Sequence, residues 1–213
     1  MTEHAAADRR YLPAMGHDRL LPLYDAVTRL AGVRRAHGRL LDGAGLAAGQ
    51  QVLEIGCGTG ELTLAAKRRR PGACVVGLDP DPRALSVGIH KAGRAGLDVR
   101  FVRGFADALP MADGSVDRVL SSLMLHHLED GEKDRALREV LRVLRPGGEL
   151  HLLDFGGSAV PATVRGHGGR IADNAGDRIP RRLRAAGFAE VAEIARLRLR
   201  VPGGRCAVFR AVR

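Results

Sequence analysis

Gln51-Val52-Leu53-Glu54-Ile55-Gly56-Cys57-Gly58-Thr59-Gly60-Glu61-Leu62 is the stretch that decides the fold. Its apolar first half predicts a short buried strand, and the residues from Glu61 onward predict a helix. The three alternating glycines therefore lie in a strand-to-helix turn. Glycine in such a turn permits positive φ and removes the Cβ atom, so a ligand can touch the backbone while the first N–H groups of the helix point at its anionic part. The turn is accordingly a predicted ligand site.

The spacing of these glycines distinguishes two kinds of ligand turn. Gly56, Gly58 and Gly60 give G-x-G-x-G, with Glu54 two positions earlier, whereas a dinucleotide-binding turn has G-x-G-x-x-G. The pattern resembles the first motif of class I S-adenosylmethionine-dependent methyltransferases. The alternative is a glycine-rich turn that is purely structural and holds no ligand, and the motifs farther along the chain argue against it.

The resemblance extends over roughly residues 48–213, and residues 17–47 fit it more loosely. It implies an α/β fold with a Rossmann-like sheet of seven strands, mostly parallel, with an antiparallel closing hairpin and an N-terminal helical cap. It also implies S-adenosyl-L-methionine as the cofactor. We therefore expect an N-terminal arm and helical cap at residues 1–47 and a cofactor-binding methyltransferase domain at residues 48–213.

Hydrophobic periodicity places the remaining elements. Two amphipathic helices are expected within residues 17–47, with Gly32 between them. Beyond the glycine turn we expect strands at 73–79, 99–102, 115–121, 149–154, 191–199 and 206–211, and helices at 83–95, 130–145 and 171–186. The last two strands form a hairpin through Pro202-Gly203-Gly204. A Gly-rich loop at 156–170 is expected over the active edge, either as a mobile lid or as a poorly ordered segment.

Composition and charge limit the classes of function. The chain has 213 residues, 45% of them hydrophobic, which suits one globular core. No run approaches the ~18 apolar residues of a membrane span and the start lacks a signal-peptide pattern, so we expect a cytoplasmic protein. The formal net charge is +10, but the arginines are scattered, and the compact run Lys67-Arg68-Arg69-Arg70 lies at a predicted helix end that favours cations. With few aromatic residues to stack on bases, no nucleic-acid partner is expected.

Cys57, Cys74 and Cys206 are widely separated and lack C-x-x-C spacing, which argues against a zinc site or a disulfide framework. We expect them to be small buried hydrophobic residues, and we expect no metal ion. A homodimer is compatible with the sequence.

Asp79 lies about twenty residues past the glycines, the distance at which one β-α-β unit returns an acid to a nucleoside ribose. An ionised carboxylate only accepts hydrogen bonds, and it can accept from both ribose hydroxyls. Asp79, with Pro80 beside it, is the predicted ribose-binding position. The alternative is that Asp79 caps the next helix, since Pro80-Asp81-Pro82 is typical of a helix entry.

Gly104-Phe105-Ala106-Asp107-Ala108-Leu109-Pro110 resembles the family segment in which an Asp-Ala pair recognises adenine. The sequence departs from that pattern, because Phe105 occupies the position of the usual aspartate and the carboxylate falls two residues later. We expect Phe105 to stack on or edge the adenine, the Ala106 N–H to reach a ring nitrogen, and Asp107 to bind the exocyclic amine. The alternative packs Phe105 in the core and turns Asp107 to solvent.

Ser121 lies at the end of the fourth expected strand, where ligands bind in open α/β sheets, and it is predicted to contact the cofactor. Leu123-Met124-Leu125-His126-His127-Leu128 follows it. Imidazole titrates near neutral pH, so His127 and, after it, His126 are candidates for a general base. In the resembled family a His-His-Leu sequence occurs irrespective of substrate, which favours a role in the architecture of the pocket.

The predicted function is methyl transfer from S-adenosylmethionine to a small-molecule acceptor, since the sequence most resembles the methyltransferases of ubiquinone and menaquinone biosynthesis. The glycines and Cys57 would admit the methionine portion, and Glu54 would act on its ammonium group. His17 and Tyr24 of the expected cap are further candidates for contact with an aromatic or lipidic acceptor. Two alternatives stay open: methylation of RNA or protein, and a protein that binds S-adenosylmethionine without transferring its methyl group.

Overall fold

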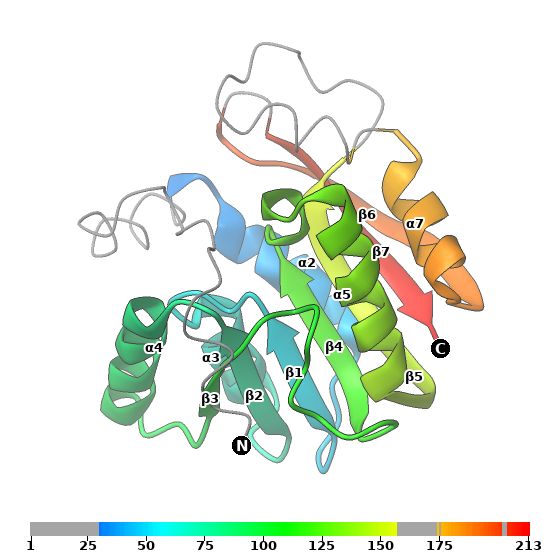
Figure 1. The fold of residues 1–213 in the computed structure, drawn as a ribbon. Helices are drawn as coiled ribbons and strands as arrows, with labels where there is room; N and C mark the ends of the chain where they lie inside the picture. The colour runs from blue at the N-terminus through cyan, green and yellow to red at the C-terminus, as the bar shows by residue number, and fades with distance from the viewer. Residues whose placement is uncertain (1–29, 157–173, 175, 202–203) are drawn as a thin grey trace.

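The computed structural model of the chain describes residues 30–156, 174, 176–201 and 204–213. Figure 1 shows a twisted sheet with helices on both of its faces. The sheet has seven strands in the order β3-β2-β1-β4-β5-β7-β6. The pairs among the first five are parallel, whereas β7 runs antiparallel to both β5 and β6. The predicted α/β class, the seven strands and the antiparallel closing hairpin are confirmed.

The elements alternate along the chain as the hydrophobic pattern predicts. The strands are β1 Gln51–Ile55, β2 Cys74–Asp79, β3 Arg100–Arg103, β4 Val116–Ser122, β5 Leu144–Phe155, β6 Glu190–Arg198 and β7 Arg205–Val212. The helices are α2 Val33–Ala44, α3 Glu61–Arg69, α4 Pro82–Arg94, α5 Asp130–Val143 and α7 Arg178–Ala186, with a short 3₁₀ helix, η3, at Leu125–His127. The expected second helix of the N-terminal region is therefore present as α2.

Alternate side chains of the strands fill two hydrophobic cores, because successive residues of a strand point to opposite faces of the sheet. Leu53 and Ile55 of β1 pack on the face covered by α5 and α7, and Val52 packs on the face covered by α2 and α3. Leu40 and Leu41 place α2 within the second core. This helix is thus fixed against the sheet, with its first residues at the edge where β1 and β4 end. The boundary expected after residue 47 stays a prediction.

Two element boundaries differ from the prediction by more than two residues. β5 begins at Leu144 instead of residue 149, because Leu144 pairs with Val116 across a register shift and the Pro-Gly-Gly sequence lies inside the strand. α7 begins at Arg178 instead of residue 171, because Gly176 has a φ of 65°, which a right-handed helix does not contain.

Several expectations fall outside the described residues: the first amphipathic helix before residue 30, the loop from residue 157 to 170, and Pro202-Gly203 of the closing turn. The three cysteines differ in burial. Cys57 and Cys206 are buried as expected, but Cys74 is exposed because β2 begins with it at the rim of the sheet.

Candidate cofactor site

Residues 56–60, called the glycine corner below, join β1 to α3. One of the three glycines has free space on its Cβ side. Gly56, Gly58 and Gly60 have φ values of 68°, 51° and 80°, which favour glycine. A Cβ atom on Gly56 would lie 2.2 Å from Met124 Cγ, and one on Gly60 would lie 2.9 Å from Phe101 Cζ. A Cβ atom on Gly58 would meet nothing within 4 Å. Two glycines are therefore required by packing, and Gly58 has the free space that a ligand needs.

Asp79 binds directly to this corner. Its carboxylate accepts the backbone N–H of Gly58 at 2.8 Å and that of Asp81 at 2.9 Å. The helix cap of α4 is Asp81, whose side chain accepts the Arg83 N–H at 2.8 Å. The capping role considered for Asp79 therefore belongs to its neighbour. Asp79 instead connects the end of β2 to the open glycine.

Glu54 and Asp79 are two buried acids beside the corner. Glu54 accepts a hydrogen bond from the Thr63 hydroxyl, and burial raises the pKa of its carboxyl from 4.5 to about 8. Burial also raises the pKa of Asp79 from 3.8 to about 6, against the opposing effect of its two backbone N–H donors. A cationic ligand at the corner would favour the ionised form of both groups. The site therefore suits a positively charged ligand.

A cleft of about 420 Å³, open to solvent, lies against the corner. Its walls come from α2, the end of β1, the start of α3 and the end of β4. The lining residues are Val33, His37, Glu54, Gly56, Cys57, Gly58, Thr59, Glu61, Leu62, Ser122 and Leu123. Four predicted site residues, Glu54, Gly56, Cys57 and Gly58, are thus brought together on one surface.

His37 of α2 is a cleft residue that the sequence reasoning missed. Its Nε2 lies 3.0 Å from the Ser122 hydroxyl of β4, and burial lowers the pKa of the imidazole from 6.5 to about 4. The ring is therefore neutral at physiological pH. The available signal was a polar residue on the apolar face of α2, four residues after Val33 and three before Leu40.

The two adjacent histidines lie elsewhere. His126 is buried, and both its ring Nδ1 and its backbone N–H contact the Asp154 carboxylate, at 2.8 and 3.2 Å. Its ring also packs edge-on against Phe155, and the ring of half-buried His127 lies 4.2 Å from it, centroid to centroid. Neither histidine lines the cleft. His17 and Tyr24 lie outside the described residues.

The sequence of this region is similar to those of known proteins. Residues 52–148 match the family model described as a methyltransferase domain. The demethylmenaquinone methyltransferase of Thermus thermophilus is 41% identical over 139 residues, which are 64% of this chain and 62% of that protein. These matches identify residues 52–148 as similar to a methyltransferase domain.

Solved structures share the fold of this chain. The YcgJ protein of Bacillus subtilis superposes with a TM-score of 0.72 at 21% identity, covering 84% of this chain and 98% of that one. The cyclase SpnF superposes with a TM-score of 0.66 at 28% identity, covering 75% of this chain and 59% of that one. The chain spans about three fifths of the length of the curated relatives that it matches.

The predicted adenine segment lies in the loop between β3 and β4. Phe105 is half-buried and forms an isolated bridge with Ala108, and it belongs to neither hydrophobic core. Ala106 packs against the core beneath α5. Asp107 is not turned to solvent, since its side chain is 8% exposed and pairs with Arg135 Nε at 3.3 Å. Contact of these residues with adenine stays a prediction.

Ser121 and Pro80 complete the predicted set. The Ser121 hydroxyl is fully buried and has no hydrogen-bond partner within the described ranges, and it does not line the cleft. Its neighbour Ser122 does. Pro80 follows Asp79, and its carbonyl accepts a hydrogen bond from Arg103 Nε at 3.3 Å. Leu123 has a φ of 54°, an uncommon value for a residue with a side chain, at the point where β4 reaches the cleft.

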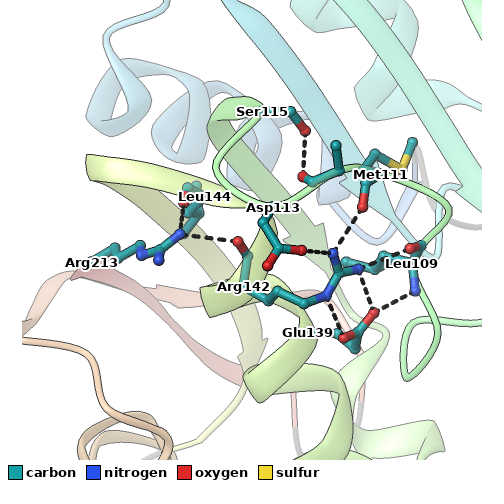
Figure 2. Close-up of polar contacts among 9 residues, drawn as sticks. Leu109, Met111, Asp113, Ser115, Glu139, Arg142, Leu144 and Arg213 are labelled. Carbon is teal, nitrogen blue, oxygen red and sulfur yellow. Dashed lines mark hydrogen bonds and ion pairs between the residues drawn. The ribbon is translucent and has the colours of Figure 1, made fainter.

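Arg142 of α5 fastens this loop to the methyltransferase fold, as Figure 2 shows. Its guanidinium donates to the carbonyls of Leu109 and Met111 at 3.0 and 2.9 Å, and to the carboxylates of Asp113 and Glu139. Glu139 in turn accepts the Leu109 N–H at 2.8 Å. Hydrogen bonding from Arg142 lowers the pKa of the Glu139 carboxyl. One side chain therefore fixes both the path of the loop and the acid that supports it.

Arg142→Met is expected to lower the free energy of unfolding by about 2 kcal/mol, because several hydrogen bonds are lost and the partly buried Leu109 carbonyl loses its donor. Chemical denaturation measures this. The matched control is Arg145→Met, which removes a half-exposed ion pair with Asp117 and should cost less than about 1 kcal/mol. Equal costs for the two variants would contradict the role of Arg142.

In the part of the chain that the structure describes, no helix combines the length and apolarity that a membrane crossing needs. Within the same residues, no three His, Cys, Asp or Glu side chains gather as ligands for a metal ion.

Proposed function

We propose that the chain transfers a methyl group from S-adenosyl-L-methionine to a small-molecule acceptor. The observation that carries this proposal is the junction of Gly58 and Asp79. An acid one β-α-β unit beyond the corner reaches its open glycine at 2.8 Å, at the carboxyl ends of β1 and β2. Ligands of open α/β sheets bind at this edge.

The residues present fit this cofactor. Gly58 has no atom within 4 Å on its Cβ side, so the amino-acid portion can approach the backbone. Each oxygen of Asp79 already accepts one N–H and retains a lone pair for a ribose hydroxyl. Glu54 supplies a carboxylate for the ammonium group. When bound, the cofactor supplies an electrophilic methyl group, and the cleft has to orient it toward the acceptor and exclude water.

The acceptor proposed is a small aromatic molecule of the quinol type. The name of the Thermus relative, a demethylmenaquinone methyltransferase, supports this class. Apolar side chains of Val33, Leu62 and Leu123 on the cleft wall suit such an acceptor. Arg142 and Arg182 pair with acids on neighbouring elements, so these two arginines have a role in the fold. We therefore favour a small molecule over RNA as the methyl acceptor.

The proposal is tested with S-adenosylmethionine that carries a labelled methyl group. The chain is incubated separately with a short-chain demethylmenaquinol and with total RNA, and the label is followed into each. Transfer to the quinol and none to RNA is the expected result. Transfer to RNA alone, with a strong dependence on salt, would replace the small-molecule proposal with RNA methylation.

A second candidate is an enzyme that uses the fold and its cofactor site without transferring methyl. Its support is the 28% identity with SpnF, which is named as a cyclase. The labelled cofactor separates the two candidates. Binding of the cofactor with all label retained on it, across a full extract of small metabolites, would favour this second candidate.

The free energy of unfolding of the ligand-free chain is expected to fall as the pH rises from about 6.5 to about 8. In the unfolded chain Glu54 ionises near 4.5, whereas burial keeps it protonated in the folded chain, so only the unfolded state gains from ionisation in this window. Asp79 adds the same trend between 3.8 and about 6. Between about 4 and 6.5 the buried His37 opposes this trend, because its lowered pKa lets the folded chain bind fewer protons than the unfolded chain. Thermal melts from pH 6.5 to about 8 measure the decline.

Glu54→Gln is the control for this pH dependence, because the amide cannot ionise and the decline should become shallower. Saturating S-adenosylmethionine should stabilise the wild-type chain more as the pH rises, since the cationic ligand favours both carboxylates. A melting temperature that rises with pH between 6.5 and 8 would contradict the burial of Glu54.

A further inference from the structure

His37 and Ser122 form a hydrogen-bonded pair on the wall of the cleft. The roles proposed above for the glycines, Glu54 and Asp79 do not involve this pair. The two residues are 85 positions apart, on α2 and β4, and their side chains lie 3.0 Å apart. Within the described part of the chain, Ser122 is the hydrogen-bond partner of the buried His37 ring. The pair faces the same cleft as Gly56 and Gly58.

The order of the strands gives the pair a position along the ligand. Reading the sheet from β3, the predicted adenine loop follows β3, Asp79 ends β2, the glycine corner follows β1, and Ser122 ends β4. A nucleoside with its ribose at Asp79 and its base toward β3 directs its other substituent across the glycine corner toward β4. In the proposed cofactor that substituent carries the amino acid group.

The chemistry of the pair suits an anion. If Nε2 of His37 accepts the Ser122 hydroxyl, Nδ1–H is free to donate. If Nε2–H donates to Ser122, the serine hydroxyl is free to donate. Either tautomer therefore leaves the pair one donor that is not used between the two side chains, and both residues line the cleft. The imidazole is neutral, because burial lowers its pKa to about 4.

The two acidic residues that line the cleft, Glu54 and Glu61, have different partners. Glu61 is paired with Lys91 Nζ at 2.9 Å, and Glu54 lies beneath the corner, where it can receive an ammonium group. A zwitterionic amino acid group placed here thus has an acid for its ammonium and needs a donor for its carboxylate. Neutral donors can supply that hydrogen bond without adding a cation beside the sulfonium.

We propose that the His37–Ser122 pair binds the carboxylate of the amino acid portion of S-adenosylmethionine and so selects ligands that carry this group. This inference rests on the proposed cofactor and deepens it. In this proposal His37 positions S-adenosylmethionine, the methyl donor, and does not act as a base toward the methyl acceptor.

The test compares two ligands by calorimetry. S-adenosylhomocysteine has the amino acid portion, and 5′-methylthioadenosine keeps the same nucleoside thioether without it. His37→Leu should weaken binding of S-adenosylhomocysteine by about tenfold, the loss of one hydrogen bond to a charged group, and leave methylthioadenosine binding unchanged. His37→Gln retains a donor and should keep most of the affinity. Thermal melts of each variant establish that it is folded.

Ser122→Ala should reproduce the selective loss, and its combination with His37→Leu should add little, because the two residues act as one unit. Equal losses for both ligands would overturn the inference in favour of a purely structural pair. Unchanged binding of S-adenosylhomocysteine in both variants would overturn it as well. Failure of the wild-type chain to bind either ligand would overturn the proposed cofactor itself, and the inference with it.

Discussion

Asp79→Asn is expected to reduce the affinity of the chain for S-adenosylhomocysteine by about thirtyfold, or about 2 kcal/mol. The amide keeps the size of the side chain but replaces one acceptor oxygen with a donor. That donor would face the backbone N–H of either Gly58 or Asp81, which the carboxylate now accepts at 2.8 and 2.9 Å, and it could not accept from a ribose hydroxyl. Calorimetry measures the affinity, and the variant should stay folded because an amide needs no ionisation in a buried position.

Asp81→Asn is the matched control for this variant. Asn is as good a helix cap as Asp, so the hydrogen bond to the Arg83 N–H is kept and α4 is undisturbed. Affinity within about twofold of wild type is expected, since only a charge next to the site is removed. Wild-type affinity in Asp79→Asn, or the same loss in both variants, would contradict the ribose role of Asp79.

Alanine substitutions at two glycines of the corner should have different effects, one mainly on ligand affinity and the other mainly on stability. Gly58→Ala places a methyl group in the open space of the cleft and should lower the affinity for S-adenosylhomocysteine at least tenfold. Its cost to stability should be only the ~1 kcal/mol of a left-handed residue with a side chain. Gly56→Ala adds a collision with Met124 to the same backbone cost and should lower the free energy of unfolding by about 3 kcal/mol.

Gly45→Ala controls for the backbone effect alone. Gly45 has a φ of 53°, a Cβ atom there would also meet nothing within 4 Å, and it ends α2 away from the cleft. This variant should lose about 1 kcal/mol of stability and no affinity. Gly58→Ala with unchanged affinity would show that the open side of the corner is not where the ligand approaches.

The sequence identified the cofactor corner because its parts are close in the chain or joined by one regular unit. The three glycines lie within five consecutive residues, and Asp79 follows at the end of the next helix and strand, which have typical lengths. Such spacing is nearly independent of the rest of the fold. The seven-stranded, mostly parallel sheet and its closing hairpin were predicted as well, from the family that the sequence resembles.

The missed features depend on contacts between distant parts of the chain. The partner of His37 is Ser122, and only the packing of α2 on β4 brings them together. Nothing in the pattern of α2 distinguishes this histidine from a buried structural one. The role of Arg142 was hidden for the same reason, since its carbonyl partners lie on a loop about thirty residues earlier.

The candidate bases were placed by proximity in sequence to the end of β4, and the structure separates them from the cleft. A short 3₁₀ helix after β4 turns His126 toward Asp154 of the adjacent strand. Periodicity does not report a three-residue turn of this kind. The shifted start of β5 has a similar cause, because a strand that begins with a Pro-Gly-Gly sequence has the composition of a turn.

The most direct test of the account is a crystal structure of the chain with S-adenosylhomocysteine. The account predicts both ribose hydroxyls within hydrogen-bonding distance of the Asp79 carboxylate and the amino acid portion lying over Gly58 toward Ser122. A nucleoside bound elsewhere, or a corner whose Asp79 carboxylate contacts only the two backbone N–H groups while the ligand is present, would contradict it.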